Sequence, residues 1–183
     1  PLHSMFMEPI HVLGAGSIGL LFAASIRTAF PSYPIRILLR EHYAPTLQNQ
    51  QRDHNKQECI SVCLQHQRRL RTVHIPAQLI SAAVSDSTKP PIRNLLLTPK
   101  AFQAVPAVRS ILSRLAVGPA GRDNEESSSL SSVSLKSSQP STTNLIVLCN
   151  GALAVRDELQ ELLLQEQLED SVRVVLATTT HGA

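Results

Sequence analysis

The chain has 183 residues, of which 43% are hydrophobic and 17% charged, a composition typical of a globular domain with its own core. Aromatic residues make up only 3%, tryptophan is absent and the formal net charge is +3, which argues against a protein that binds nucleic acid by base stacking or through a basic tract. No apolar run reaches the roughly 18 residues that a membrane span needs, so we expect neither nucleic acid nor a membrane as a partner.

The first predicted elements surround a G-x-G-x-x-G motif. Residues 10–13 are apolar and predict a strand, and residues 17–28 predict a helix. Gly14 permits the turn between them, Gly16 lets a pyrophosphate approach the backbone, and Gly19 lets the helix pack on the strand. Unpaired N–H groups at the helix N-terminus favour a phosphate there, although a purely structural turn is the alternative. The residues expected to bind the pyrophosphate of a dinucleotide are Gly14, Ala15, Gly16, Ser17, Ile18 and Gly19.

The second predicted strand, residues 34–40, ends on an arginine. Dinucleotide sites for NAD usually have an acidic residue about 20 positions beyond the motif, where it accepts a hydrogen bond from the ribose. Here the residue is Arg40, whose guanidinium suits a 2′-phosphate by charge and by its forked donors. The sequence therefore predicts NADP rather than NAD. Two features argue against it: Glu41 follows directly, and Arg40 also suits a solvated strand end.

Residues 42–71 are polar and show no catalytic spacing. We expect an exposed helix or a long surface excursion within residues 48–67, followed by minor strands at residues 72–75 and 79–84. His54, His66 and His74 are separated in sequence and are interpreted as surface residues, and the three cysteines lack the spacing of a metal site. We therefore expect reduced thiols and no bound metal.

A buried strand is predicted next, at residues 92–98. Lys100 follows its carboxyl end, where ligands bind in open α/β sheets. A helix is expected over residues 101–115, because its apolar residues recur on one face. Residues 118–143 are rich in serine and predict a low-complexity insert within the domain rather than a domain boundary.

The strand–helix pattern then resumes. Residues 144–149 predict a strand that ends at Asn150, residues 152–168 a helix, and residues 172–177 a last strand. Strands alternating with helices predict an α/β fold. We expect a Rossmann-type, doubly wound and mostly parallel sheet, with residues 1–183 forming one NADP-binding domain that contains the serine-rich insert.

Several motifs occur in the order found in one family. They are the Gly14 to Gly19 turn, Leu-Leu-Arg40, Leu-Leu-Thr-Pro-Lys100-Ala-Phe-Gln, Leu-Cys-Asn150-Gly151 and Ala-Thr-Thr-Thr-His181-Gly-Ala183. With these motifs the chain resembles the N-terminal half of ketopantoate reductase (2-dehydropantoate 2-reductase). The serine-rich insert is longer than the compact bacterial pattern and points to a eukaryotic version, for example a fungal one.

The resemblance implies a role for each motif. The glycine turn would bind the NADP pyrophosphate, and Arg40 would bind the 2′-phosphate. Lys100 would lie beside the cofactor, and Asn150 would contact both cofactor and substrate. Ala183 would contact the cofactor through its backbone. The implied reaction is the NADPH-dependent reduction of ketopantoate, a small 2-oxo acid, to pantoate in pantothenate biosynthesis.

The resemblance also implies what this stretch lacks. In the family, a helical C-terminal substrate domain supplies the lysine that donates a proton; that domain is absent here, so we assign no catalytic residue and expect the chain to be incomplete. Three alternatives stay open: a noncatalytic NADP-binding module, a truncated fragment, and a relative that reduces another 2-oxo acid. We expect a cytoplasmic protein, with the mitochondrion as the alternative compartment and a homodimer as the expected assembly at full length.

Overall fold

A computed structural model describes residues 7–51, 58–66, 69–86, 88–115 and 142–178 of the chain. The serine-rich insert, apart from its last residues, and Ala183 therefore lie outside the described residues. Among the described residues, no helix has the length and apolar character to span a membrane.

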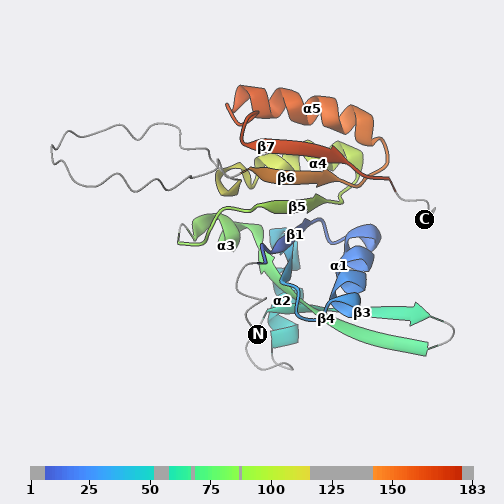
Figure 1. The fold of residues 1–183 in the computed structure, drawn as a ribbon. Helices are drawn as coiled ribbons and strands as arrows, with labels where there is room; N and C mark the ends of the chain where they lie inside the picture. Colours follow the sequence, from blue (N-terminus) through green and yellow to red (C-terminus); the bar gives the residue numbers. More distant parts are fainter. Residues whose placement is uncertain (1–6, 52–57, 67–68, 87, 116–141, 179–183) are drawn as a thin grey trace, which may run out of the picture.

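The described part of the chain contains a seven-stranded sheet in the order β3-β4-β2-β1-β5-β6-β7 (Figure 1). Its strands are β1 (Ile10–Leu13), β2 (Ile35–Leu39), β3 (Cys59–His66), β4 (Arg69–Leu79), β5 (Asn94–Leu97), β6 (Thr143–Val147) and β7 (Val172–Leu176). Neighbouring strands are parallel except β3, which pairs antiparallel with β4 and forms a hairpin at one end of the sheet. The predicted Rossmann-type, mostly parallel fold is confirmed.

Helices cover both faces of this sheet. They are α1 (Ser17–Ala29), α2 (Ala44–Gln51), α3 (Ile80–Ser85), α4 (Ala101–Arg109) and α5 (Ala152–Gln165), with the 3₁₀ turns η2 (Glu41–Tyr43) and η3 (Leu112–Arg114). Side chains of α1 and α2 pack in one apolar cluster, and those of α3, α4 and α5 pack in another on the opposite face. Because the central strands β1, β2 and β5 are covered on both sides, their sequences are nearly continuous apolar runs.

The chain changes direction at β1, and this places the site. From β1 it runs outward through β2 and β4, then returns to form β5 on the other side of β1. Strands β2 and β5 both pair with β1 in parallel, so their carboxyl ends meet at one edge. This reversal is where doubly wound sheets open a crevice for ligands.

Two local predictions were wrong, and a third was right in kind but too short. Residues 79–84 were expected as a minor strand, but residues 80–85 form α3, because β4 ends at Leu79 and the chain turns into a helix there. The described residues within 48–67 do not form one helix: α2 ends at Gln51, and residues 59–66 form the strand β3. Residues 72–75 are a strand, as expected, but within the longer β4.

The helix expected over residues 101–115 is also shorter than predicted. It ends at Arg109, and Ile111 departs from helical geometry with φ −127° and ψ 11°. The chain turns there because Leu115 forms a bridge with Ile92, and the Ile92 N–H donates to the Arg114 carbonyl at 2.6 Å. Tertiary pairing at residue 115 therefore overrides a continuous apolar pattern.

Candidate functional site

The glycine loop links β1 to α1 as the motif predicts. Gly14 follows β1 with φ +114°, a conformation that L side chains rarely adopt, and Gly16 precedes α1 in extended geometry. The Thr98 hydroxyl, at the end of β5, donates to the carbonyl of Gly14 at 3.0 Å and to that of Leu13 at 3.3 Å. The neighbouring strand thus holds the loop against the edge of the sheet.

The three glycines of the motif have different surroundings. A Cβ on Gly14 would lie 2.9 Å from both the Thr98 hydroxyl and the Pro99 nitrogen. A Cβ on Gly19 would overlap the Gly14 carbonyl and the Thr98 hydroxyl, so this glycine allows the close packing of helix on loop that the motif predicts. A Cβ on Gly16 would meet no protein atom within 4 Å. The space in front of Gly16 is therefore open to a ligand.

The N-terminus of α1 opens toward this space. Gly16 is its N-cap residue, no side chain caps the helix there, and its first turn holds no acidic residue. The first N–H groups of a helix lack intrahelical partners, and the helix dipole adds partial positive charge. This end of α1 can accept an anion from solvent.

A cleft of about 610 Å³ lies at the carboxyl ends of β1, β2, β5 and β6. Eight of the residues predicted to bind the cofactor line it: Gly14, Ala15, Gly16, Ser17, Ile18, Arg40, Lys100 and Asn150. Gly19 is buried behind the loop, and Ala183 lies outside the described residues. The described lining residues include arginine, lysine and histidine but no aspartate or glutamate. The cleft is therefore positively charged.

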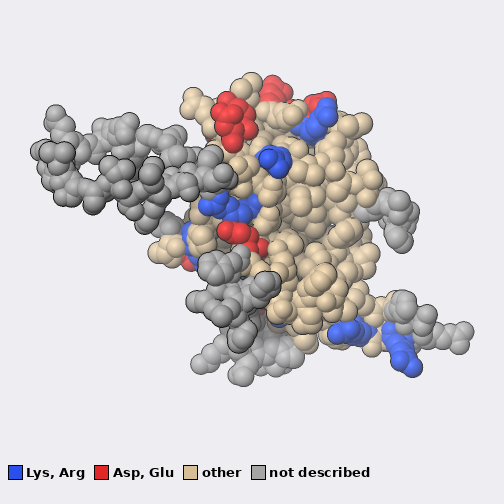
Figure 2. Space-filling model, viewed as in Figure 1, with Lys and Arg blue, Asp and Glu red and all other residues tan. Residues whose placement is uncertain are grey.

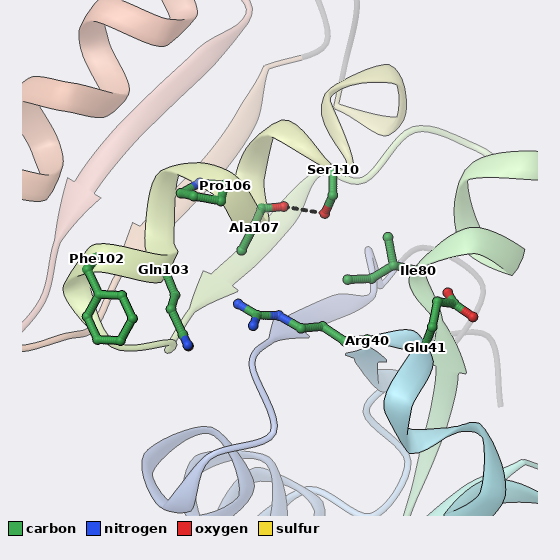
Figure 3. A pocket seen from close by; sticks show the side chains of 8 residues that line it. All are labelled: Arg40, Glu41, Ile80, Phe102, Gln103, Pro106, Ala107 and Ser110. Atoms are coloured by element: carbon green, nitrogen blue, oxygen red, sulfur yellow. Dashed lines mark hydrogen bonds between the residues drawn. The ribbon is translucent and has the colours of Figure 1, made fainter.

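Arg40 stands at the boundary between this cleft and a smaller hollow of about 350 Å³. It follows β2, it is exposed, and its side chain extends toward Gln103 on α4 (Figure 3). Within the described part of the chain, Arg40 takes part in none of the three ion pairs and in none of the side-chain hydrogen bonds. Its guanidinium is free to bind a ligand.

Glu41, the residue that argued against NADP, is held elsewhere. Its carboxylate accepts a hydrogen bond from the Ser81 N–H in α3 at 3.1 Å. Glu41 lines the smaller hollow but not the larger cleft. Figure 3 shows the Arg40 and Glu41 side chains leaving neighbouring positions in opposite directions.

Lys100 and Asn150 approach the cleft from its other side. Lys100 is the exposed N-cap residue of α4, and Asn150 follows β6 just before Gly151, which caps α5 in left-handed geometry with φ +77°. A Cβ on Gly151 would lie 3.8 Å from that of Ala101, so the starts of α4 and α5 are adjacent. Beside Asn150, partial burial raises the pKa of the Cys149 thiol and disfavours the reactive thiolate.

Several lining residues were not predicted. His42 and Tyr43 follow Arg40 on η2, with ring centroids 4.3 Å apart, and Ile80 and Gln103 line both hollows. Their only sequence signal was proximity to Arg40 or Lys100, and Ile80 could not be placed because its segment was expected to be a strand. Among the described residues, no group of three or more histidine, cysteine or acidic side chains could hold a metal ion.

The face of the molecule in Figure 2 carries basic side chains at the tip of the β3–β4 hairpin, and acidic side chains beside a few basic ones near α5. Within the cleft, Arg40 and Lys100 supply the positive charge.

Comparison with known proteins agrees with this geometry. No curated protein and no solved structure gave a significant match. The family model described as ketopantoate reductase PanE/ApbA matches residues 10–118, from the strand before the glycine loop to beyond η3. Because this match covers more than half of the chain and includes the loop, Arg40 and Lys100, the chain belongs to the ketopantoate reductase PanE/ApbA family.

Proposed function

We propose that the chain binds NADP and forms the cofactor-binding part of an enzyme that reduces ketopantoate to pantoate in pantothenate biosynthesis. Membership of the family makes it part of an NAD(P)-binding oxidoreductase of the 2-oxo acid reductase type. One observation carries the step to NADP: the cleft combines an uncapped helix N-terminus with two free cations and no described acidic lining residue. Bound NADPH supplies the hydride that converts the ketone to a hydroxyl.

The protein's part in this reaction is to bind and orient. The open space at Gly16 and the first N–H groups of α1 suit the two charges of a pyrophosphate. Arg40, on the neighbouring strand end, suits the additional phosphate on the adenosine ribose. Ile80 and Ala107 give the smaller hollow apolar walls on either side, which suits the adenine ring.

The other end of the cleft suits the reacting groups. Asn150 offers an amide with a donor and an acceptor, and Lys100 offers a cation, both next to the start of α4. We propose that Asn150 orients both the nicotinamide end of the cofactor and the substrate, and that Lys100 lies beside the cofactor. The substrate would be a small 2-oxo acid, whose carboxylate suits a positive cleft.

The test compares NADPH with NADH as ligands by fluorescence titration. We expect NADPH to bind at least tenfold more tightly, since a charge-assisted hydrogen bond contributes about 1.5–3 kcal/mol. The variant Arg40→Asp should abolish this preference. Arg71→Asp, which makes the same charge change at an exposed position of β4, should retain it. An unchanged preference in Arg40→Asp would refute the assignment of Arg40.

A noncatalytic NADP-binding module is the second candidate. One observation favours it: Lys100 is the only lysine among the described residues that line the cleft, and the family resemblance places it beside the cofactor rather than in the proton-donor role. Oxidation of NADPH that depends on ketopantoate distinguishes the two candidates. Turnover by the chain would establish a reductase, and oxidation with another 2-oxo acid instead would change the substrate but not the class.

A further inference from the structure

The hydrogen bond from Ser81 to Glu41 joins two segments that are 40 residues apart in sequence. Ser81 is the second residue of α3, so its N–H has no partner within the helix. The N-cap residue of α3 is Leu79, whose apolar side chain cannot cap it. Glu41 therefore caps α3 from a different element, the turn η2 that follows β2.

This bond lies beside the smaller hollow. Arg40 immediately precedes Glu41 and Ile80 immediately precedes Ser81, and both of these preceding residues line the hollow and the larger cleft. A bond between positions 41 and 81 therefore fixes the spacing of the two walls that Arg40 and Ile80 form. Figure 3 shows Glu41 and Ile80 together on the wall that faces α4.

The same bond determines where the charge of Glu41 lies. A carboxylate next to Arg40 could repel a 2′-phosphate or accept a hydrogen bond from a ribose hydroxyl, as acidic residues do in NAD sites. Here one carboxylate oxygen is occupied by the Ser81 N–H, and the side chain is directed away from the guanidinium. An acidic residue at this position is therefore compatible with binding of a 2′-phosphate.

We propose that Glu41 is a positioning residue for cofactor selectivity. By capping α3 it holds Arg40 and Ile80 as the two walls of an adenosine 2′-phosphate pocket, and the same hydrogen bond directs its own carboxylate, which lines the smaller hollow, away from the Arg40 guanidinium. The inference rests on the proposed binding of NADP, and it adds a residue that touches neither the phosphate nor the reacting atoms.

The experiment measures the dissociation constants of NADPH and NADH for the wild-type chain and for Glu41→Ala and Glu41→Gln. Glu41→Ala removes the acceptor, so we expect the preference for NADPH to fall about fivefold, the effect of one hydrogen bond. Glu41→Gln keeps an acceptor oxygen without the charge and should keep or increase the preference. Glu158→Ala, an exposed change on α5, is the matched control and should leave it unaltered.

Each result decides between stated outcomes. If the wild type prefers NADPH and Glu41→Ala prefers it equally, the positioning role is overturned while the proposed function stands. If Glu41→Gln loses as much preference as Glu41→Ala, the charge and not the hydrogen bond matters, and the inference is again wrong. If the wild type binds neither nucleotide, the proposed function itself fails and the selectivity role fails with it. Circular dichroism of each variant shows whether α3 and the sheet are retained.

Discussion

Gly16 and Gly19 belong to one motif but have different surroundings. We therefore expect substitution of one to affect ligand binding and substitution of the other to affect stability. Gly16 has φ −77°, which alanine adopts without strain, and an added Cβ meets no protein atom. Gly16→Ala should therefore keep the free energy of unfolding or raise it by about 0.4–1 kcal/mol, because alanine restricts the unfolded chain. The new methyl group would occupy the space proposed for the pyrophosphate, so NADPH should bind at least tenfold more weakly.

Gly19→Ala should do the opposite. Its Cβ would overlap the Gly14 carbonyl and the Thr98 hydroxyl, so the loop or the helix must shift. We expect a loss of about 1–3 kcal/mol in unfolding free energy, the usual cost of overpacking. Urea unfolding and fluorescence titration of both variants check the pair. Equal losses of stability would contradict the open space at Gly16, and unaltered NADPH binding by Gly16→Ala would contradict its role in the cleft.

At the scale of elements, the sequence was sufficient for the strands that form short apolar runs. The strands β1, β2, β5, β6 and β7 were all predicted within a few residues, because continuous apolar runs between turn residues have few other interpretations. Helix α1 followed from the glycine motif. These elements carry the glycine loop, Arg40, Lys100 and Asn150, which is why the candidate site could largely be placed from sequence.

The elements that were missed depend on distant partners. Strand β3 is recognisable only from its pairing with β4, since its own residues are partly polar and one of its faces is exposed. Residues 80–85 are a short apolar run, which periodicity cannot assign to strand or helix. Ser81, whose N–H donates a hydrogen bond to Glu41, belongs to this run. The two residues are 40 positions apart, so no local sequence pattern indicates their contact. The wall of the smaller hollow could not be predicted for this reason.

The turn η3 offers a prediction at the same scale. The Arg114 side chain is buried and donates to three backbone carbonyls, of Asp86 at 2.6 Å, Lys89 at 3.2 Å and Pro90 at 2.7 Å. It thus ties η3 to the segment that leads into β5. Arg114→Met fills similar space but leaves these carbonyls unpaired, and we expect unfolding to become easier by about 2–4 kcal/mol.

The matched control for this variant is Arg109→Met on α4. Arg109 pairs with Glu166 at 3.7 Å, and both side chains are largely exposed, so its loss should change the unfolding free energy by no more than about 0.5 kcal/mol. Urea unfolding of both variants measures the difference. Similar midpoints for Arg114→Met and Arg109→Met would show that the carbonyl contacts of Arg114 do not stabilise the segment before β5.

For the molecule as a whole, the candidate site lies at the carboxyl edge of the sheet, whereas the stability of the fold comes from its core. His11 in β1 bears on that stability. Burial, together with the positive charges of Arg36, Arg114 and Lys89, lowers the pKa of His11 from 6.5 to about 4. The His11 Nδ1 atom is buried without a hydrogen-bond partner among the described residues. The folded protein therefore holds this imidazole neutral, on the half of β1 that lies away from the cleft.

This arrangement makes the stability of the fold depend on pH in a defined direction. Between about pH 4 and 6.5 the unfolded chain binds a proton at His11 that the folded chain does not, so the unfolding free energy falls as the pH falls through this window. A shift of this size amounts to at most about 3 kcal/mol. Urea midpoints at pH 7.5, 5.5 and 4.5 measure the loss, and His11→Leu should remove most of it.

The control His42→Leu changes an exposed histidine at the cleft and should keep the wild-type dependence on pH, since His42 lies outside the core. If His11→Leu and the wild type lose stability in parallel, carboxylates rather than the buried imidazole determine the acid sensitivity of the fold.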